Sequence, residues 1–143
     1  MRHDVVGINL GKKGLTKYIG VALISGYFSL LLCGLFLPLL GNQPLGYDAI
    51  LHSFFIGFVF SMIFAHGPII LPGVLGISLK PYHPILFFWL MLLHGSWITQ
   101  TIADVVLSMQ MRKYAGLFSA VAIVGYLLSM ASILVRVRKK QVV

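Results

Sequence analysis

Four long apolar runs restrict the possible folds of this chain more than any other feature. They extend over about residues 18–40, 48–70, 82–107 and 114–135. A helix of about 20 apolar residues is long enough to cross a hydrocarbon core about 30 Å thick. The sequence is 59% hydrophobic and only 10% charged, whereas soluble domains carry about 25% charged residues. We therefore expect one all-α integral membrane domain, a bundle of four transmembrane helices surrounded by the lipid bilayer.

The positive charge of the chain is concentrated near its ends. Lys and Arg number 11 against 3 acidic residues, which gives a net charge of +8. The N-terminal segment, the loop with Lys80 and the C-terminal tail carry most of these residues, and the other two loops carry only Arg112 and Lys113. Because Lys and Arg are enriched in cytoplasmic loops, both termini are predicted to be cytoplasmic. Topology and anionic headgroups account for the charge, so no nucleic-acid partner is expected.

Prolines and small residues within the apolar runs indicate where helices end and where they pack together. Pro68 and Pro72 are predicted to close the second run, because proline interrupts helical hydrogen bonding. Small residues recur at helical spacing in two runs: Ser25, Ser29 and Cys33 in the first, and Gly125, Ser129 and Ser132 in the fourth. Another helix can approach such a seam closely. Cys33 is the single cysteine, so it is expected to be a buried structural thiol.

Histidines within the apolar runs are the strongest indication of a function. His52 and His66 are 14 positions apart, about four helical turns, and are predicted to share one helix face. Within the third run, residues spaced three or four apart form a stripe along one predicted helix face: His83, Phe87, Met91, His94, Trp97, Thr101 and Asp104. Ionisable groups are costly inside a membrane and are therefore candidates for function. Asp104 is expected at the interface, beside Arg112.

Haem is the cofactor that these histidines suggest. Imidazole is the commonest metal ligand, and haem iron takes axial histidine in many proteins. At about 1.5 Å per residue, His52 lies roughly 6 Å below the outer boundary, His94 about 15–20 Å and His66 roughly 27 Å. His94 can therefore pair with either of the others, and both pairings stay open. Aromatic side chains for the walls of a haem site are abundant: Phe54, Phe55, Phe58, Phe60, Phe64, Phe87, Phe88 and Trp89.

Each histidine also has a structural interpretation. His52 and His94 can form hydrogen bonds between helices, and His66 can bond a backbone carbonyl freed by Pro68. A further hypothesis is a proton or solute carrier that uses His66, His94 and Asp104 as relay groups. Four spans without an internal repeat argue against a carrier.

One stretch resembles a known family. The run HSFFIGFVFSMIFAHGPIILPGVLG, followed by LKPYHPILFFWLMLLHGSW, is similar to the repeating core of the NnrS family of haem- and copper-associated membrane proteins. That family in turn resembles the catalytic subunit of haem–copper oxidases. The resemblance covers about residues 48–104 and includes His52, the step Gly57–Phe58 and the Pro72–Gly76 loop. It implies haem binding, with His52 as the first ligand and His94 or His66 as the second.

These observations predict a small membrane subunit that binds haem b through His52, His94 and His66. It would transfer electrons or handle a diatomic gas such as NO or O2 within a larger respiratory redox complex or a homo-oligomer. The chain is not expected to be an enzyme alone, although it can belong to an oxidoreductase. The expected location is the inner membrane of a bacterium or archaeon. The alternative is a cofactor-free accessory subunit that packs against larger membrane subunits.

Overall fold

The computed structural model describes residues 14–77 and 81–141, and all regular structure in these ranges is helical. The elements are α2 (Leu15–Leu40), α3 (Gly46–His52), the π-helix η1 (Ser53–Val59), α4 (Phe60–Val74), α5 (Ile85–Val105) and α6 (Met109–Gln141). The helices that are long and apolar enough to cross a membrane are Leu15–Leu40, Gly46–Val74, Ile85–Val105 and Met109–Lys139. The predicted all-α bundle of four membrane-spanning helices is confirmed.

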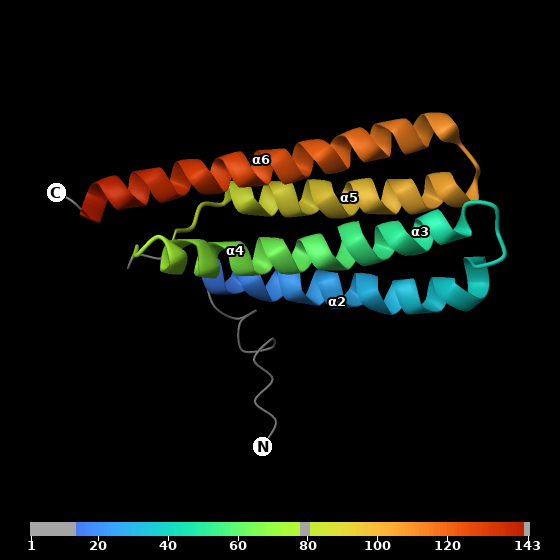
Figure 1. Cartoon of the computed structure of the whole chain (residues 1–143), viewed down its shortest axis with the longest axis horizontal. Coiled ribbons are helices and arrows are strands. Elements are labelled where there is room, and N and C mark those ends of the chain that lie inside the picture. Colours follow the sequence, from blue (N-terminus) through green and yellow to red (C-terminus); the bar gives the residue numbers. More distant parts are fainter. Residues whose placement is uncertain (1–13, 78–80, 142–143) are drawn as a thin grey trace, which may run out of the picture.

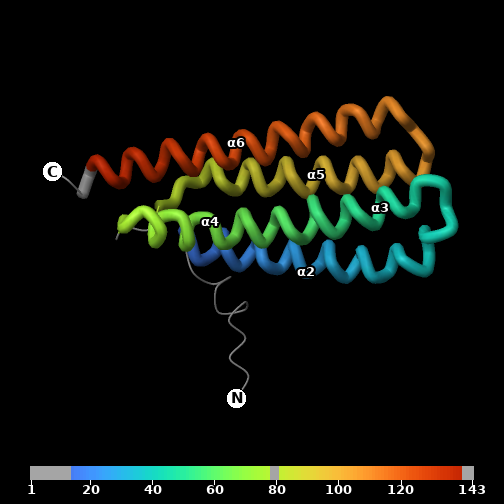
Figure 2. The backbone as a smooth tube through the Cα atoms, in the orientation of Figure 1, coloured from blue at the N-terminus to red at the C-terminus, as the bar shows by residue number. Residues whose placement is uncertain are grey.

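The four spans lie side by side and alternate in direction. Figure 1 shows α2 beside α4 and α5 beside α6, and Figure 2 shows that α3, η1 and α4 follow one another as one continuous rod. The start of α2 and the end of α6 therefore lie at the same end of the bundle, which we call the basic end after Lys17, Arg136, Arg138 and Lys139. The opposite end, where α3, α5 and α6 meet, is called the ion-pair end. The Lys80 loop and the basic residues of positions 1–13 lie outside the described residues.

Apolar side chains cover the outside of the bundle as well as its core. Leu31, Val74 and Leu128, for example, are 60%, 79% and 65% exposed. Lipid solvates such a surface, and helices suit it because they satisfy their backbone hydrogen bonds internally. The largest fully buried apolar side chains form the core between the helices: Tyr18, Phe64, Leu86, Leu90, Leu93, Tyr126 and Met130.

The second span continues through both of its prolines. Proline has no N–H, so Pro68 leaves the carbonyl of Phe64, four residues earlier, without its helical donor. The Tyr126 hydroxyl donates to that carbonyl at 2.9 Å, and the two aromatic rings stack with centroids 3.8 Å apart. The prediction that the prolines close the helix is therefore wrong. His66 was expected to bond a carbonyl freed by Pro68, but it bonds the carbonyl of Met62 instead.

Gly76 marks the actual end of this span. Its φ of 65° lies in the left-handed region that favours glycine. The Ile77 N–H then donates to the Pro72 carbonyl at 2.8 Å, as in a Schellman motif. The span consequently ends at Val74, four residues beyond the predicted end.

Small residues allow close helix packing within the chain. A Cβ atom at Gly26 of α2 would overlap the end of Met62, and one at Gly125 of α6 would overlap the ring of Trp89. The small-residue face of α2 thus packs against the second span, and that of α6 packs against α5. Cys33 is buried, as predicted. Helices of the same chain therefore cover the seam of α2 and the Gly125 and Ser129 part of the seam of α6, whereas Ser132 is exposed.

The π-helix η1 changes the rotation of the second span. The N–H of Phe60 donates to the carbonyl of Phe55, five residues earlier, where an α-helix would reach back four. A π turn holds more residues than an α turn, and such segments occur frequently at functional sites. The 14 residues from His52 to His66 therefore no longer correspond to four whole α turns. The predicted sharing of one helix face by His52 and His66 assumed a regular α-helix, which this segment is not.

Candidate functional site

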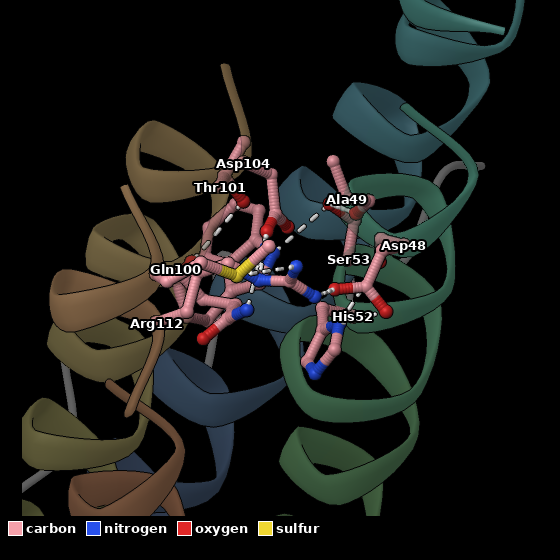
Figure 3. Close-up of polar contacts among 10 residues, drawn as sticks. Asp48, Ala49, His52, Ser53, Gln100, Thr101, Asp104 and Arg112 are labelled. Carbon is pink, nitrogen blue, oxygen red and sulfur yellow. Dashed lines mark hydrogen bonds and ion pairs between the residues drawn. The ribbon is translucent and has the colours of Figure 1, made fainter. Parts of the chain in front are cut away.

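Charged side chains from three helices meet at the ion-pair end (Figure 3). Arg112 lies in the first turn of α6, and its Nε donates to Asp104 Oδ1 of α5 at 2.9 Å. Its Nη2 also pairs with the Asp48 carboxylate of α3. The Asp104 side chain is 1% exposed and Arg112 is 21% exposed. The expected place of Asp104 beside Arg112 is thus confirmed, and one guanidinium joins three helices.

Asp104 has one satisfied and one unsatisfied oxygen. Its Oδ1 accepts a second hydrogen bond, from Gln100 Nε2 at 3.3 Å, one turn earlier on α5. Its Oδ2 is buried and has no partner among the residues that the structure describes. Gln100 was not identified from the sequence, although its position four residues before Asp104 places both on one face. Two carboxylates, of Asp48 and Asp104, thus share one guanidinium in this cluster.

A metal ion is one possible occupant of this end. Asp48, His52 and Asp104 offer ligand atoms that lie within 4.8 Å of one another. Arg112, however, already bridges both carboxylates and supplies the positive charge that a cation would supply. We therefore assign this cluster as an ion-pair network that holds α3, α5 and α6 together.

His52 and His66 share the same hydrogen-bonding pattern. His52 Nδ1 lies 2.9 Å from the Asp48 carbonyl, and His66 Nδ1 lies 2.8 Å from the Met62 carbonyl. A carbonyl oxygen only accepts, so each Nδ1 carries the proton. A neutral imidazole has one N–H, and Nε2 therefore keeps its lone pair. Metal-ligating histidines typically donate their other N–H to such a partner, which fixes the tautomer and the orientation of the ring.

His66 lies in an apolar groove on the lipid-facing side of the bundle. The groove, between α4 and α6, has a volume of about 420 Å³. Its lining is almost entirely apolar: Val59, Met62, Ile63, His66, Gly67, Ile70, Leu71, Tyr126 and Leu127. His66 is exposed, and its Nε2 makes no hydrogen bond to the described part of the chain. An imidazole lone pair is thus available beside apolar walls.

His94 is engaged inside the bundle. Its Nε2 lies 2.7 Å from Ser61 Oγ of α4, and Ser61 is fully buried. This bond places His94 level with Ser61, which lies nine residues after His52 and five before His66. These steps correspond to about 13 Å and 8 Å along the helix. His94 therefore faces neither of the two imidazoles with which it was expected to pair.

The different depths of His52, His94 and His66 along the bundle decide whether two of them can hold one haem. A haem between two axial histidines requires both imidazoles at the same depth on opposite sides of one slot. His52 belongs to the ion-pair end, His94 binds Ser61, and His66 lies in the outer groove. The described residues do not fit a haem held by two of these histidines within one chain. Among them, His66 is the imidazole whose Nε2 lies beside an apolar groove.

Other buried hydroxyls tie α5 to its neighbours. Trp97 Nε1 donates to Ser53 Oγ at 3.0 Å, and Ser96 Oγ lies 2.8 Å from Ser119 Oγ of α6. Serines inside apolar helices commonly make such bonds across an interface. These partners, and Ser61, were not identified from the sequence. A serine in an apolar run was the available signal, but it does not indicate which helix it faces.

Comparisons with known proteins leave the function open. No curated protein and no solved structure matches the chain. A model of one family, described as a domain of unknown function (DUF8744), matches residues 1–135. The resemblance to the NnrS family therefore stays a prediction. Since the match extends over most of the chain, this protein belongs to the DUF8744 family.

Proposed function

We propose that this protein is a small multi-pass membrane subunit that binds haem b and either transfers electrons or binds a diatomic gas such as NO or O2. The observation that carries the proposal is the geometry of His66, whose protonated Nδ1 is held by the Met62 carbonyl. Its Nε2 lone pair is then available in the apolar groove. Such a nitrogen is the form of histidine that binds haem iron.

The groove supplies the remaining requirements of a haem site. Ile63, Ile70 and Leu127 provide apolar walls for the porphyrin faces. His66 would be the axial ligand, and the haem would supply the redox change or the binding of the gas. Since His66 would be the one ligand from this chain, the bound haem would still be able to take a gas or an imidazole of another chain. Because the groove opens toward lipid, assembly into a homo-oligomer or a larger redox complex would cover the haem.

The other two histidines receive different roles in this proposal. His52 has the same tautomer as His66, but its Nδ1 lies 3.5 Å from Asp48 Oδ1, within the ion-pair network. His94 is assigned to the helix contact with Ser61. The membrane orientation belongs to the proposal as well, with the basic end in the cytoplasm of a bacterium or archaeon.

Matched histidine variants test the assignment of the ligand. Haem is titrated into the detergent-solubilised protein, and the Soret band is recorded for wild type, His66→Ala and His52→Ala. We expect the band to be lost in His66→Ala, restored by added imidazole, and retained in His52→Ala. Loss in His52→Ala with retention in His66→Ala would overturn the assignment.

A second candidate function is a cofactor-free accessory subunit. It is favoured by the bonds between Ser61 and His94 and between Trp97 and Ser53, which use buried polar groups to join helices. Under this hypothesis the wild-type protein binds no haem at any concentration. Replacing His94 by Ala would then weaken co-purification with a partner subunit without any spectral change.

A further inference from the structure

A second groove lies at the basic end of the bundle, far from the ion-pair network. It lies between the start of α5 and the C-terminal half of α6 and has a volume of about 260 Å³. Its lining combines apolar and hydrogen-bonding side chains: His83, Ile85, Leu128, Ser129, Ser132, Ile133 and Arg136. It is therefore chemically unlike the almost entirely apolar groove beside His66.

The polar side chains of this groove present donors. The N–H of Ile85 donates to His83 Nδ1 at 3.2 Å, so the proton of a neutral His83 is on Nε2. Ser129 Oγ accepts a hydrogen bond from Trp89 Nε1 at 2.8 Å, which leaves the hydroxyl proton of Ser129 available. The Arg136 guanidinium has donors only. An imidazole N–H, a hydroxyl and a guanidinium thus line one groove.

No described carboxylate balances this charge. Asp48 and Asp104 both lie at the ion-pair end, where they pair with Arg112. Within residues 14–77 and 81–141, every ion pair involves these two carboxylates and none includes Arg136. A positively charged set of donors without a described carboxylate partner is complementary to an anion. Phosphate oxygens suit it because they accept charge-assisted hydrogen bonds from arginine.

The position of the groove indicates where the anion comes from. The spanning part of α6, Met109–Lys139, has 31 residues and is therefore about 47 Å long. This exceeds a hydrocarbon core of about 30 Å, so the last turns with Arg136 reach the headgroup region. Leu128 and Ile133 continue the groove toward the bundle centre as apolar wall. We infer that this groove binds an anionic phospholipid, with the phosphate at Arg136 and His83 and the rest of the lipid deeper along Ile133, Ser129 and Leu128.

Lipid binding to the whole purified protein tests this inference. Native mass spectrometry measures retention of phosphatidylglycerol and phosphatidylcholine by wild type, Arg136→Gln and Arg138→Gln. Arg138 is exposed, lies two residues further along α6 and does not line the groove, so its variant has the same charge change. We expect wild type to prefer phosphatidylglycerol. Arg136→Gln should lower its affinity about tenfold, as expected for a hydrogen bond to a charged group, and Arg138→Gln should lower it less than twofold.

Three results would overturn the inference. Equal losses in the two arginine variants would mean that only the general surface charge attracts the lipid. Equal retention of both lipids by wild type would exclude an anion site. Displacement of phosphatidylglycerol by millimolar inorganic phosphate would identify a free anion, and not a lipid, as the occupant. Ser129→Ala serves as a second variant with unchanged charge, and it should lower phosphatidylglycerol retention by a smaller factor than Arg136→Gln. Haem spectra play no part in this test, so it is independent of the proposed function.

Discussion

Replacing Arg112 by Gln should be one of the most destabilising single changes at the ion-pair end. The substitution removes the charge that serves two carboxylates at once. Asp48 is 31% exposed and can be solvated when it loses its partner. Asp104 is 1% exposed, so its carboxylate would stay buried with only Gln100 as a donor.

The loss of stability in Arg112→Gln can be worked out from the exposed fractions of Asp48 and Asp104. A pair with a partly exposed partner contributes about 0–1 kcal/mol, which sets the loss at Asp48. Breaking a buried pair by removing one partner costs about 3–5 kcal/mol, which sets the loss at Asp104. We therefore expect Arg112→Gln to lower the free energy of unfolding by about 4 kcal/mol. Most of this loss should disappear when Asp104→Asn is added, because the uncompensated buried charge is then removed.

Unfolding in mixed micelles, followed by circular dichroism, measures this loss. Lys113→Gln is the matched control, since it removes the same charge from the next residue, which is exposed. It should change stability by no more than about 0.5 kcal/mol. The reasoning would be refuted if Arg112→Gln cost no more than Lys113→Gln, or if the double variant were as unstable as Arg112→Gln alone.

The remaining predictions are measured in the same unfolding assay. Tyr18→Phe should stabilise the protein by about 1 kcal/mol, because the buried Tyr18 hydroxyl has no described partner. Tyr126→Phe should destabilise it by about 1–3 kcal/mol, since the Phe64 carbonyl freed by Pro68 loses its donor. Equal effects of the two changes would contradict this prediction. Gly125→Ala should cost about 1–3 kcal/mol through overlap with Trp89. Gly116→Ala, with open space around it, should be neutral or stabilising.

Some of this architecture could be predicted because it depends on local sequence. Four apolar runs, each long enough for the bilayer, were sufficient to predict four spanning helices. The spacing along the third run placed His94 and Asp104 on one stripe, and both do point to neighbouring helices, through Ser61 and Arg112. Arg112, which follows the third span, was correctly predicted to lie beside Asp104. Periodicity and charge carry this information without reference to the rest of the chain.

The arrangement of the histidines could not be predicted in the same way. Pro68 is a helix breaker by local rules, but Tyr126, more than 50 residues away in sequence, satisfies the carbonyl that it frees. The π-helix then changes the rotation between His52 and His66, and no feature of the local sequence predicts a π-helix there. The depth of His94 depends on which residue of the second span lies opposite, and that residue is Ser61. The continuation of the helix past Pro68, the π-helix and the depth of His94 all depend on tertiary contacts.

The pigment content of the protein, purified from membranes without added haem, tests the central claim most directly. The account predicts a b-type pyridine haemochrome spectrum with a stoichiometric amount of haem per chain or per pair of chains. A preparation with intact helical circular dichroism that contains no haem, and takes up none when haem is supplied, would contradict it.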